Sequence, residues 1–230
     1  SQKVITHAAA PCPVELKHKM IDWWGNIFYE YYSGSEGVGM THADPDQWLK
    51  FPGTVGKPLM GIIHICDDQG QEVPPGEIGK IYFESDHEFN YHNDNKKREE
   101  VKHSHHSSWS SFGDIGYVNE EGYLFLTDRE SFMIISGGVN IYPQEVENLL
   151  SMHEDVEDVA VIGIPDDDMG EQVKAFIKLS KSAEDRSNQE QYFIEYTRSH
   201  LANYKCPKSI SFVNDLPRSD AGKLVKRYLK

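Results

Sequence analysis

The spacing of apolar residues along the chain predicts three helices. They cover approximately residues 13–24, 143–152 and 187–202, where apolar side chains recur every three or four positions. Pro143 opens the second of these segments, and its fixed φ suits a first helical turn. We expect the third helix to turn four apolar side chains inward: Tyr192, Phe193, Tyr196 and Leu201.

Continuous apolar runs predict strands in the first half of the chain. Residues 4–7 have the pattern of a buried strand, and residues 27–32 form a second run that is rich in aromatic side chains. Several short strands are expected between residues 53 and 127, separated by turns rich in Asp, Asn and Gly. The polar segment 85–108 is expected to be an exposed loop.

After Arg129 the pattern changes to alternating strands and helices. Strand-like runs occupy residues 156–162, 173–179 and 209–213. With the second and third predicted helices they make a small α+β domain of about a hundred residues, which is an ordinary size for an independent unit. We therefore predict an α+β chain of two parts: a strand-rich part, residues 1–128, and a small α+β domain, residues 129–230.

Composition narrows the class of partner. The 230 residues include 37 acidic and 23 basic side chains, a formal charge of −14 that argues against nucleic acid, because phosphate binding requires a basic surface. Cys12, Cys66 and Cys206 are far apart and odd in number, as is typical of free thiols in a reducing compartment. No apolar run reaches membrane-spanning length and no signal-peptide pattern opens the chain, so we expect a cytoplasmic protein.

The stretch from residue 123 to residue 147 contains two breaks in its apolar pattern. A polar patch at residues 127–131 follows the first apolar run, and the pair Gly137-Gly138 follows the second. We interpret the patch as a domain boundary. The glycine pair indicates a tight turn where the backbone approaches another group closely.

This stretch resembles the motif G-R-x-x-D-x-I-x-x-x-G-x-x-I-x-x-x-E-(I/V)-E of the adenylate-forming enzymes. These are the acyl-CoA synthetases, the beetle luciferases and the adenylation domains of peptide synthetases. Further motifs follow in that family's order over nearly the whole chain. The resemblance implies that residues 1–128 are the C-terminal part of the large AMP-binding domain. Residues 129–230 would be the small, mobile C-terminal domain.

The segment Ala8-Ala9-Ala10-Pro11 resembles the family's G-A-A-P motif. By that resemblance the backbone of Ala8, Ala9 and Ala10 covers one face of the adenine of ATP. The alternative is an ordinary tight connection between a strand and a helix.

Residues 32–36 resemble the family's Y-G-x-T-E motif. The resemblance implies that Tyr32 stacks on the adenine, that Ser35 meets a phosphate and that Glu36 holds Mg²⁺, a cation that prefers oxygen ligands. Ser33 and Ser35 replace the family's Gly and Thr, and Ser35 keeps the hydroxyl. A serine–glycine loop with a solvated glutamate is the alternative.

Residues 109–116 resemble the region W-x-T-G-D-x-G of the family. This implies that Asp114 accepts hydrogen bonds from the ribose hydroxyls, although an aspartate next to Gly113 also suits a plain turn. Arg129 matches the family's arginine that contacts ribose or phosphate, a role suited to its fixed fork of donors.

The hinge of the family would fall at Ser131, where its members usually carry Asp or Lys. Phe132 also departs, since Asp is common there, and both departures put the usual hinge chemistry in doubt. Gly137 and Gly138 match the glycine beside the pantetheine tunnel of acyl-CoA synthetases. A hairpin turn is the alternative for this pair.

Three C-terminal segments also follow the family's motifs: residues 163–171 (G-x-P-D-x-x-x-G-E), 201–208 (L-A-x-Y-K-x-P-K) and 216–223 (L-P-R-T-x-x-G-K). The last implies that Lys223 bridges the carboxylate, the ATP phosphate and the attacked carbon. Without the other motifs, Lys223 would be one basic residue in a solvated tail. We interpret the acidic triplet at residues 166–168 as a solvated loop.

A group of histidines raises the question of a metal site, but its spacing fits no standard zinc pattern. We therefore do not expect a metal at these residues: His87, His92, His103, His105 and His106.

The resemblance implies an acyl-CoA synthetase that uses ATP and Mg²⁺ to convert a carboxylic acid to an acyl-adenylate and then transfers the acyl group to coenzyme A. The family's phosphate loop is absent from the 230 residues, so we expect the C-terminal part of a larger enzyme, inactive alone. The acid, fatty or aryl, is not readable from this part. The alternatives are a non-catalytic module that binds nucleotide or CoA, and an adenylation domain that loads a carrier protein.

Overall fold

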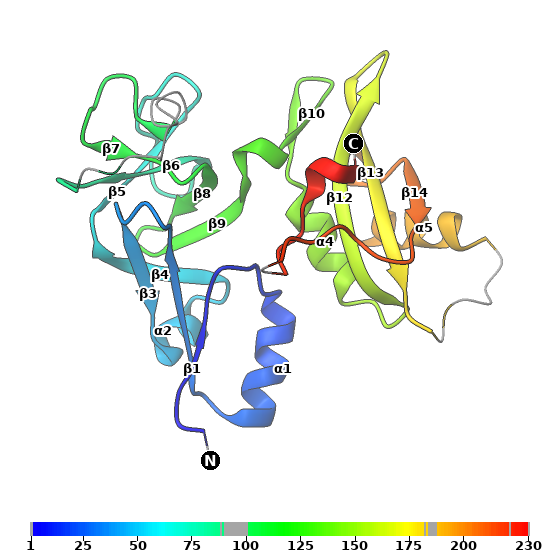
Figure 1. The fold of residues 1–230 in the computed structure, drawn as a ribbon, viewed down its shortest axis with the longest axis horizontal. Helices are drawn as coiled ribbons and strands as arrows, with labels where there is room; N and C mark the ends of the chain where they lie inside the picture. Colours follow the sequence, from blue (N-terminus) through cyan, green and yellow to red (C-terminus); the bar gives the residue numbers. More distant parts are fainter. Residues whose placement is uncertain are drawn as a thin grey trace. The chain divides into compact units, whose positions relative to one another are not determined.

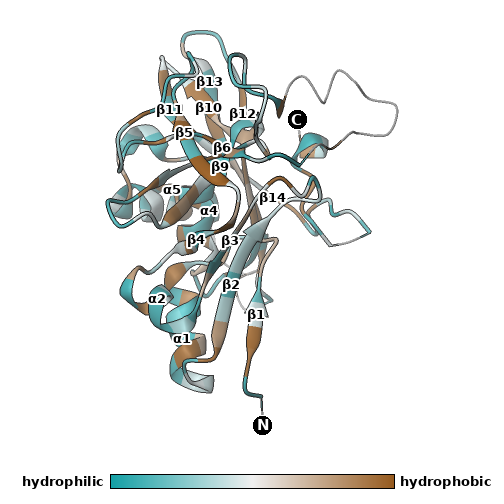
Figure 2. Ribbon diagram, turned by 90° about the vertical axis from the view of Figure 1, so that its left-hand side faces the viewer, coloured by the Kyte–Doolittle hydropathy of each residue, from teal (hydrophilic) through white to brown (hydrophobic). Residues whose placement is uncertain are grey.

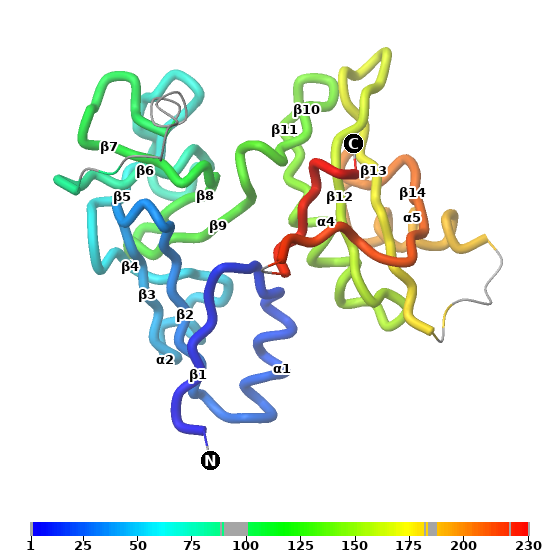
Figure 3. The backbone as a smooth tube through the Cα atoms, viewed as in Figure 1, coloured from blue at the N-terminus to red at the C-terminus, as the bar shows by residue number. Residues whose placement is uncertain are grey.

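The computed structural model describes residues 2–87, 89, 101–181, 183, 188–220 and 222–229. The chain forms two compact units, Ser1–Glu130 (unit 1) and Ser131–Lys230 (unit 2). It passes from one to the other within the short 3-10 helix η1 (Glu130–Phe132), as the backbone trace in Figure 3 shows. The α+β class predicted from the sequence is confirmed (Figure 1).

Unit 1 is built on a mixed sheet. Within the described residues its strands follow the order β1-β2-β3-β4-β9-β8-β6-β5, and β7 pairs with β6. The pairing of β1 with β2 is parallel and the others are antiparallel. The strands are β1 (Ile5–His7), β2 (Phe28–Ser33), β3 (Met40–Ala43), β4 (Thr54–Met60), β5 (Ile62–Cys66), β6 (Gly79–Glu84), β7 (Trp109–Ser110), β8 (Asp114–Val118) and β9 (Leu124–Arg129).

Phe83 on β6 has no exposed surface and belongs to the main apolar cluster of unit 1. Full burial of a side chain of this size stabilises a fold by about 1.5–3 kcal/mol. The cluster contains residues from several strands and stabilises the sheet that carries Tyr32, Asp114 and Arg129. Its buried members are Val38, Val55, Ile65, Ile81, Phe83, Phe89 and Leu124.

The sequence predicted a buried first strand, but β1 is not buried. β1 is half-exposed along its length, and Val4, just before it, is 55% exposed. The reason is its place at the end of the strand order, where only β2 pairs with it among the described residues.

The helix predicted at residues 13–24 forms as α1 (Val14–Trp24), but its apolar residues are largely exposed. Its buried side chain is Lys17, which pairs with Glu30 of β2 at 2.5 Å and lies over the Trp48 ring. Trp23 is 79% exposed. Figure 2 shows both hydrophobic and hydrophilic segments along this helix.

A short helix that the apolar pattern did not predict, α2 (Pro45–Lys50), follows β3. It begins with a capping box: Asp44 accepts the backbone N–H of Gln47 at 2.8 Å, and the Gln47 side chain accepts that of Asp44 at 3.0 Å. These reciprocal bonds satisfy donors that a helix N-terminus leaves open.

Unit 2 contains a second sheet. Among its described strands the order is β11-β10-β13-β12, with β14 parallel to β13. Helices α4 (Pro143–Ser151) and α5 (Gln189–His200) accompany the sheet. The strands are β10 (Ile134–Ser136), β11 (Val139–Ile141), β12 (Val156–Asp166), β13 (Gly170–Leu179) and β14 (Ser209–Phe212).

The hairpin of β12 and β13 is longer than the two runs predicted at 156–162 and 173–179. The ladder continues to the pair Asp166–Gly170, so the acidic triplet forms its tip. Asp166 accepts the N–H groups of Asp168 and Met169, and these bonds, with the latter the larger cause, lower the pKa of its carboxyl.

Helix α5 turns most of the predicted face inward, and Tyr192 is the exception. It buries Phe193, Ile194 and Thr197, whereas Tyr192 is 41% exposed. The Tyr192 hydroxyl instead lies 2.9 Å from Nε2 of His153, so its polar end is satisfied at the edge of the core. Tyr196 and Leu201 are partly buried against the core, as expected.

No helix in the described part of the chain is both long enough and apolar enough to cross a membrane.

Candidate functional site

Three polar side chains expected to bind nucleotide meet in unit 1. Asp114 begins β8 and Arg129 ends β9, and the antiparallel register places them opposite each other. Arg129 Nε lies 3.0 Å from Asp114 Oδ1, and the Tyr32 hydroxyl of β2 donates to Asp114 Oδ2 at 2.6 Å. Both oxygens of the Asp114 carboxylate are therefore held by separate elements.

The Asp114 side chain is only 9% exposed, whereas that of Arg129 is 57% exposed. Burial raises the pKa of the Asp114 carboxyl, and the positive charge of Arg129 and the Tyr32 hydrogen bond oppose that rise. Burial and the neighbouring Asp114 charge raise the pKa of the Tyr32 hydroxyl well above its usual value. Tyr32 is therefore a permanent donor at neutral pH.

The Tyr32 ring is fixed by two phenylalanines. It meets Phe112 edge-on at 5.6 Å between centroids and packs against Phe83 at 6.1 Å. Phe112 also explains Gly34: a Cβ on Gly34 would lie 2.4 Å from Phe112 Cδ1 and 2.5 Å from Glu36 Oε2. Sequence reasoning assigned no role to Phe112, although its place between Ser111 and Gly113 in a matched motif pointed to it.

The loop after β2 carries the candidate Mg²⁺ ligand. Ser35 Oγ donates to Glu36 Oε2 at 3.4 Å, so hydroxyl and carboxylate lie together. The described residues contain no group of three or more metal-binding side chains. One carboxylate still fits Mg²⁺, because this ion usually takes one or two protein carboxylates and completes its shell with phosphate and water.

The connection after β1 contains the three alanines. Because β1 and β2 are parallel, both strands end at the same edge of the sheet, and Ala8 to Ala10 leave from the edge that also carries Ser33. Ala9 has φ +69°, an unusual backbone for a residue with a Cβ. Ala9 and Ala10 are exposed.

The glycine pair forms the turn between β10 and β11. Gly137 has φ +57° and Gly138 has φ +80°, which fits a two-residue turn that requires positive φ at both positions. A Cβ on Gly137 would lie 2.4 Å from Met169 Cε, whereas one on Gly138 would meet nothing within 4 Å. The backbone of Gly137 therefore lies close to Met169 of the same unit, whereas the space around Gly138 is open.

The expected hinge residue, Ser131, lies in η1, and Phe132 follows it. The Lys226 ammonium lies 4.7 Å from the centre of the Phe132 ring and pairs with Glu147 Oε1 at 2.7 Å. Lys226 and Glu147 are buried, and Glu147 also accepts the N–H of Val161 at 2.6 Å. Lys226 therefore links the Phe132 ring to Glu147 of helix α4 in unit 2.

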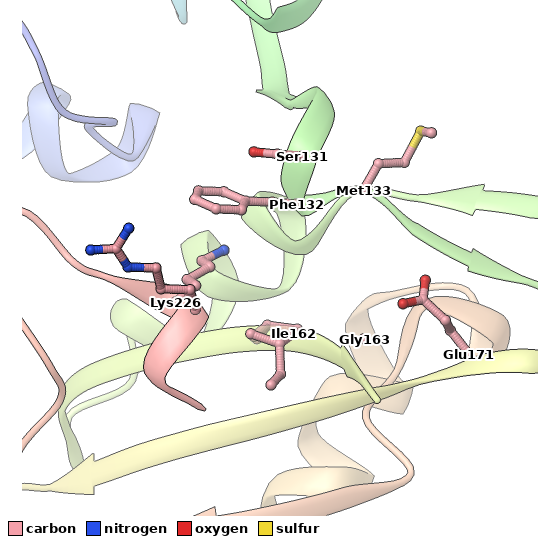
Figure 4. A pocket seen from close by; sticks show the side chains of 9 residues that line it. Ser131, Phe132, Met133, Ile162, Gly163, Glu171 and Lys226 are labelled. Carbon is pink, nitrogen blue, oxygen red and sulfur yellow. The ribbon is translucent and has the colours of Figure 1, made fainter. Parts of the chain in front are cut away.

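A cavity of about 320 Å³ opens beside Phe132 (Figure 4). Ser131 and Phe132 form one part of its wall, and the C-terminal 3-10 helix η3 (Lys226–Leu229) forms another. Its lining residues are Ser131, Phe132, Met133, Val161, Ile162, Gly163, Glu171, Lys226 and Arg227.

Lys223 is exposed in the loop that precedes η3. The loop is closed by a bridge between Arg218 and Leu224 and by a hydrogen bond of 2.9 Å from Ser219 N–H to the Lys223 carbonyl. Lys223 therefore has a hydrogen-bonded backbone carbonyl next to an exposed side chain.

One histidine of this group, His103, has a structural role. His103 is buried, unlike the exposed loop predicted around it, because its ring packs against Tyr82 at 4.9 Å and Trp109 at 5.1 Å. Its Nδ1 accepts the backbone N–H groups of His105 and His106. His92 lies outside the described residues.

Comparison with known families matches the chain to two parts of one enzyme family. Residues 1–90 match the family described as AMP-binding enzyme, and residues 145–223 match the AMP-binding enzyme C-terminal domain.

Two curated relatives match the whole chain. A long-chain-fatty-acid–CoA ligase of Bacillus subtilis is 36% identical over 232 aligned residues, which cover 100% of this chain and 40% of the relative. A 2-succinylbenzoate–CoA ligase of Bacillus pumilus is 39% identical, with 100% and 46% covered. The chain therefore spans less than half the length of these relatives.

Solved structures show the same similarity. O-succinylbenzoate CoA synthetase of Bacillus subtilis, in complex with its acyl-adenylate intermediate, matches 99% of this chain with a TM-score of 0.84 and 31% identity, and 46% of that chain is covered. The same enzyme in complex with ATP and magnesium ion gives a TM-score of 0.85 and 30% identity, with 98% and 46% covered.

Proposed function

Because the chain belongs to the AMP-binding enzyme family, we propose that it is the C-terminal part of an acyl-CoA synthetase. In this proposal the complete enzyme activates a carboxylic acid with ATP and passes the acyl group to coenzyme A. The observation that carries the proposal is the Asp114 carboxylate, which Tyr32 and Arg129 hold in unit 1. A carboxylate fixed at both oxygens is suited to receive the two hydroxyls of a ribose.

The first half-reaction is adenylate formation. The acid's carboxylate attacks the α-phosphate of ATP, a P–O bond forms, and the bond to the leaving pyrophosphate breaks. Glu36 would hold Mg²⁺, which would neutralise charge on the phosphates. We assign to Lys223 the contact with the carboxylate and the α-phosphate, where its charge stabilises the negative charge that develops.

The second half-reaction transfers the acyl group. The CoA thiolate attacks the acyl carbon, and AMP leaves with the electrons of the broken acyl–phosphate bond. We assign the turn at Gly137 and Gly138 to the pantetheine arm, supported by the open space at Gly138. We propose that the two half-reactions use different faces of unit 2 and that Ser131 is the pivot between them.

The domain assignment follows from the same proposal. Unit 1 would belong to the large AMP-binding domain and unit 2 would be the C-terminal domain, supported by the two family matches. A preceding part of the polypeptide would supply the phosphate loop and most of the acid pocket. The three cysteines are free in the structure, which supports a cytoplasmic setting.

The experiment compares this chain with the same chain joined to the preceding part of its enzyme. Each is mixed with ATP, Mg²⁺, CoA and a panel of fatty and aryl acids, and pyrophosphate and acyl-CoA are measured. We expect acid-dependent pyrophosphate and a CoA thioester from the joined protein and neither from the 230-residue chain.

Asp114→Ala in the joined protein should raise the KM for ATP strongly, and Glu120→Ala, an exposed turn residue of unit 1, is the matched control. Acyl-adenylate without any CoA thioester, but with transfer to a carrier-protein thiol, would favour a carrier-loading domain. Nucleotide binding without pyrophosphate would favour a binding module.

A further inference from the structure

Arg218 contacts two separate parts of unit 2. Its Nη1 donates to the carbonyl oxygen of Gly222 at 2.9 Å, and its Nη2 pairs with Oδ2 of Asp158 on β12. Gly222 directly precedes Lys223. A single guanidinium therefore joins the backbone next to Lys223 to the long β12–β13 hairpin of the sheet.

The loop that carries Lys223 has its own internal bonds. The Gly222 N–H donates to the Ser219 carbonyl at 2.8 Å, and the Lys223 N–H donates to Ser219 Oγ at 3.2 Å. At its base the Val225 N–H donates to the Pro217 carbonyl at 2.9 Å. These bonds all lie within the loop, so none of them joins Gly222 to the sheet.

Asp158 fixes the position of the Arg218 guanidinium relative to the sheet. Asp158 lies opposite Lys178 in the register of the β12–β13 ladder. Its Oδ1 accepts the backbone N–H of Val159 at 3.0 Å. The other oxygen faces Arg218, so the carboxylate is oriented before the arginine binds. The fork of Arg218 spans from this oxygen to the Gly222 carbonyl, a geometry that one lysine ammonium does not reproduce.

The exposure of Arg218 argues against a role in overall stability. Its side chain is 45% exposed, and exposed ion pairs contribute little to the free energy of unfolding. Lys223 has a flexible side chain on an exposed loop, and this side chain has to reach the reacting atoms. The position of its Cα therefore matters, because small displacements of a catalytic group lower the rate by large factors.

We propose that Arg218, held by Asp158, is the positioning residue for Lys223 in adenylate formation. The proposal rests on the proposed function, in which Lys223 contacts the reacting carboxylate and phosphate. Arg218 itself touches no reacting atom in it. Loss of the contact should therefore affect the half-reaction that uses Lys223 and spare the one that does not.

The test uses the joined enzyme with Arg218→Met and Asp158→Asn. Adenylate formation is measured as acid-dependent ATP–pyrophosphate exchange, and thioester formation as transfer from a synthetic acyl-adenylate to CoA. We expect each variant to lower exchange by about tenfold or more and to leave transfer within about twofold of the parent. The double variant should be no worse than Arg218→Met, because both changes remove one contact.

Arg198→Met, an exposed arginine on α5, is the charge-matched control and should leave both half-reactions unchanged. Backbone ¹⁵N relaxation of Gly222 and Lys223 in the 230-residue chain provides a readout without catalysis, and order should fall there in Arg218→Met but not in Arg198→Met.

The positioning role is overturned if Arg218→Met behaves like Arg198→Met, or if it lowers both half-reactions equally. Lys223→Ala separates this failure from a failure of the proposed function. If Lys223→Ala abolishes exchange while Arg218→Met does not, only the positioning role is wrong. If Lys223→Ala has no effect on exchange, the proposed function of Lys223 is itself wrong.

Discussion

The hydroxyl of Tyr32 donates to the carboxylate of Asp114 at 2.6 Å, although 82 positions separate the two residues in the chain. The contact depends on the sheet, in which β2 and β8 belong to the same strand order. It places one oxygen of the Asp114 carboxyl next to the Tyr32 hydroxyl, while the other oxygen lies next to the Arg129 guanidinium.

The stability of unit 1 should depend on pH through Asp114. Its pKa is raised, chiefly by burial, so the folded state binds this proton more tightly than the unfolded state. The contribution of Asp114 to stability is therefore largest at low pH and is lost as pH rises through the folded pKa, starting from about 4, the usual value for Asp. Against Asp114→Asn, the parent should become relatively less stable between pH 4 and pH 7.

Urea unfolding of the two proteins at several pH values measures this difference. Asp68→Asn, at an exposed turn of unit 1, is the control and should show no such trend. A difference that grows in the opposite direction would mean that hydrogen bonds and Arg129, rather than burial, dominate the pKa of Asp114.

Gly138→Leu should block thioester formation and leave adenylate formation nearly intact. Gly138 has φ +80° and open space around its Cα, so a leucine there strains the backbone by about 1–2 kcal/mol and projects into that space. Gly122→Leu is a matched control, because Gly122 also has φ +80° and open surroundings.

Both glycine variants should lose similar stability by thermal unfolding, but only Gly138→Leu should lose acyl-CoA production in the joined enzyme. Normal acyl-CoA output from Gly138→Leu would mean that the glycine pair is only a structural turn.

Limited proteolysis should cut the chain first between residues 128 and 132. Trypsin is expected to release a C-terminal fragment that starts at Glu130, because the connection between compact units is a common site of nicking. Mass spectrometry of the early fragments gives the measurement. Resistance around residues 128–132 at high protease concentration would contradict the expected junction.

Lys226→Met should destabilise unit 2 by about 3 kcal/mol or more, because it leaves the buried Glu147 carboxylate without its cation. Lys208→Met removes an exposed partner of Asp166 and should change the stability little. Urea unfolding of both variants is the comparison. A loss no larger for Lys226→Met than for Lys208→Met would show that the remaining contacts of Glu147, among them the Val161 N–H, satisfy its carboxylate.

The predictions from the sequence were most accurate for elements whose apolar pattern matches the face that is buried in the fold. The helix at Pro143 and the alternating strand at 173–179 form as expected, because an apolar face with one period leaves few ways to bury it. α2 was missed because it is only six residues long, although Asp44 and Gln47 at capping-box spacing marked its start.

Burial was harder to predict than secondary structure. β1 has an apolar sequence but lies at an end of the described strand order, and α1 buries Lys17 while exposing Trp23. Which side of an element is covered depends on its neighbours, and local periodicity does not contain that information. The same holds for the candidate site: motif spacing suggested Tyr32, Asp114 and Arg129, but their mutual contacts and the role of Phe112 follow only from the sheet register.

The role of Lys223 in adenylate formation alone is tested most directly by measuring the two half-reactions of Lys223→Ala in the joined enzyme. We expect acid-dependent ATP–pyrophosphate exchange to be lost, because Lys223 is assigned the positive charge at the reacting carboxylate and α-phosphate, while transfer from a synthetic acyl-adenylate to CoA continues near the parent rate. Equal loss of both half-reactions in a folded protein, or retention of exchange, would contradict it.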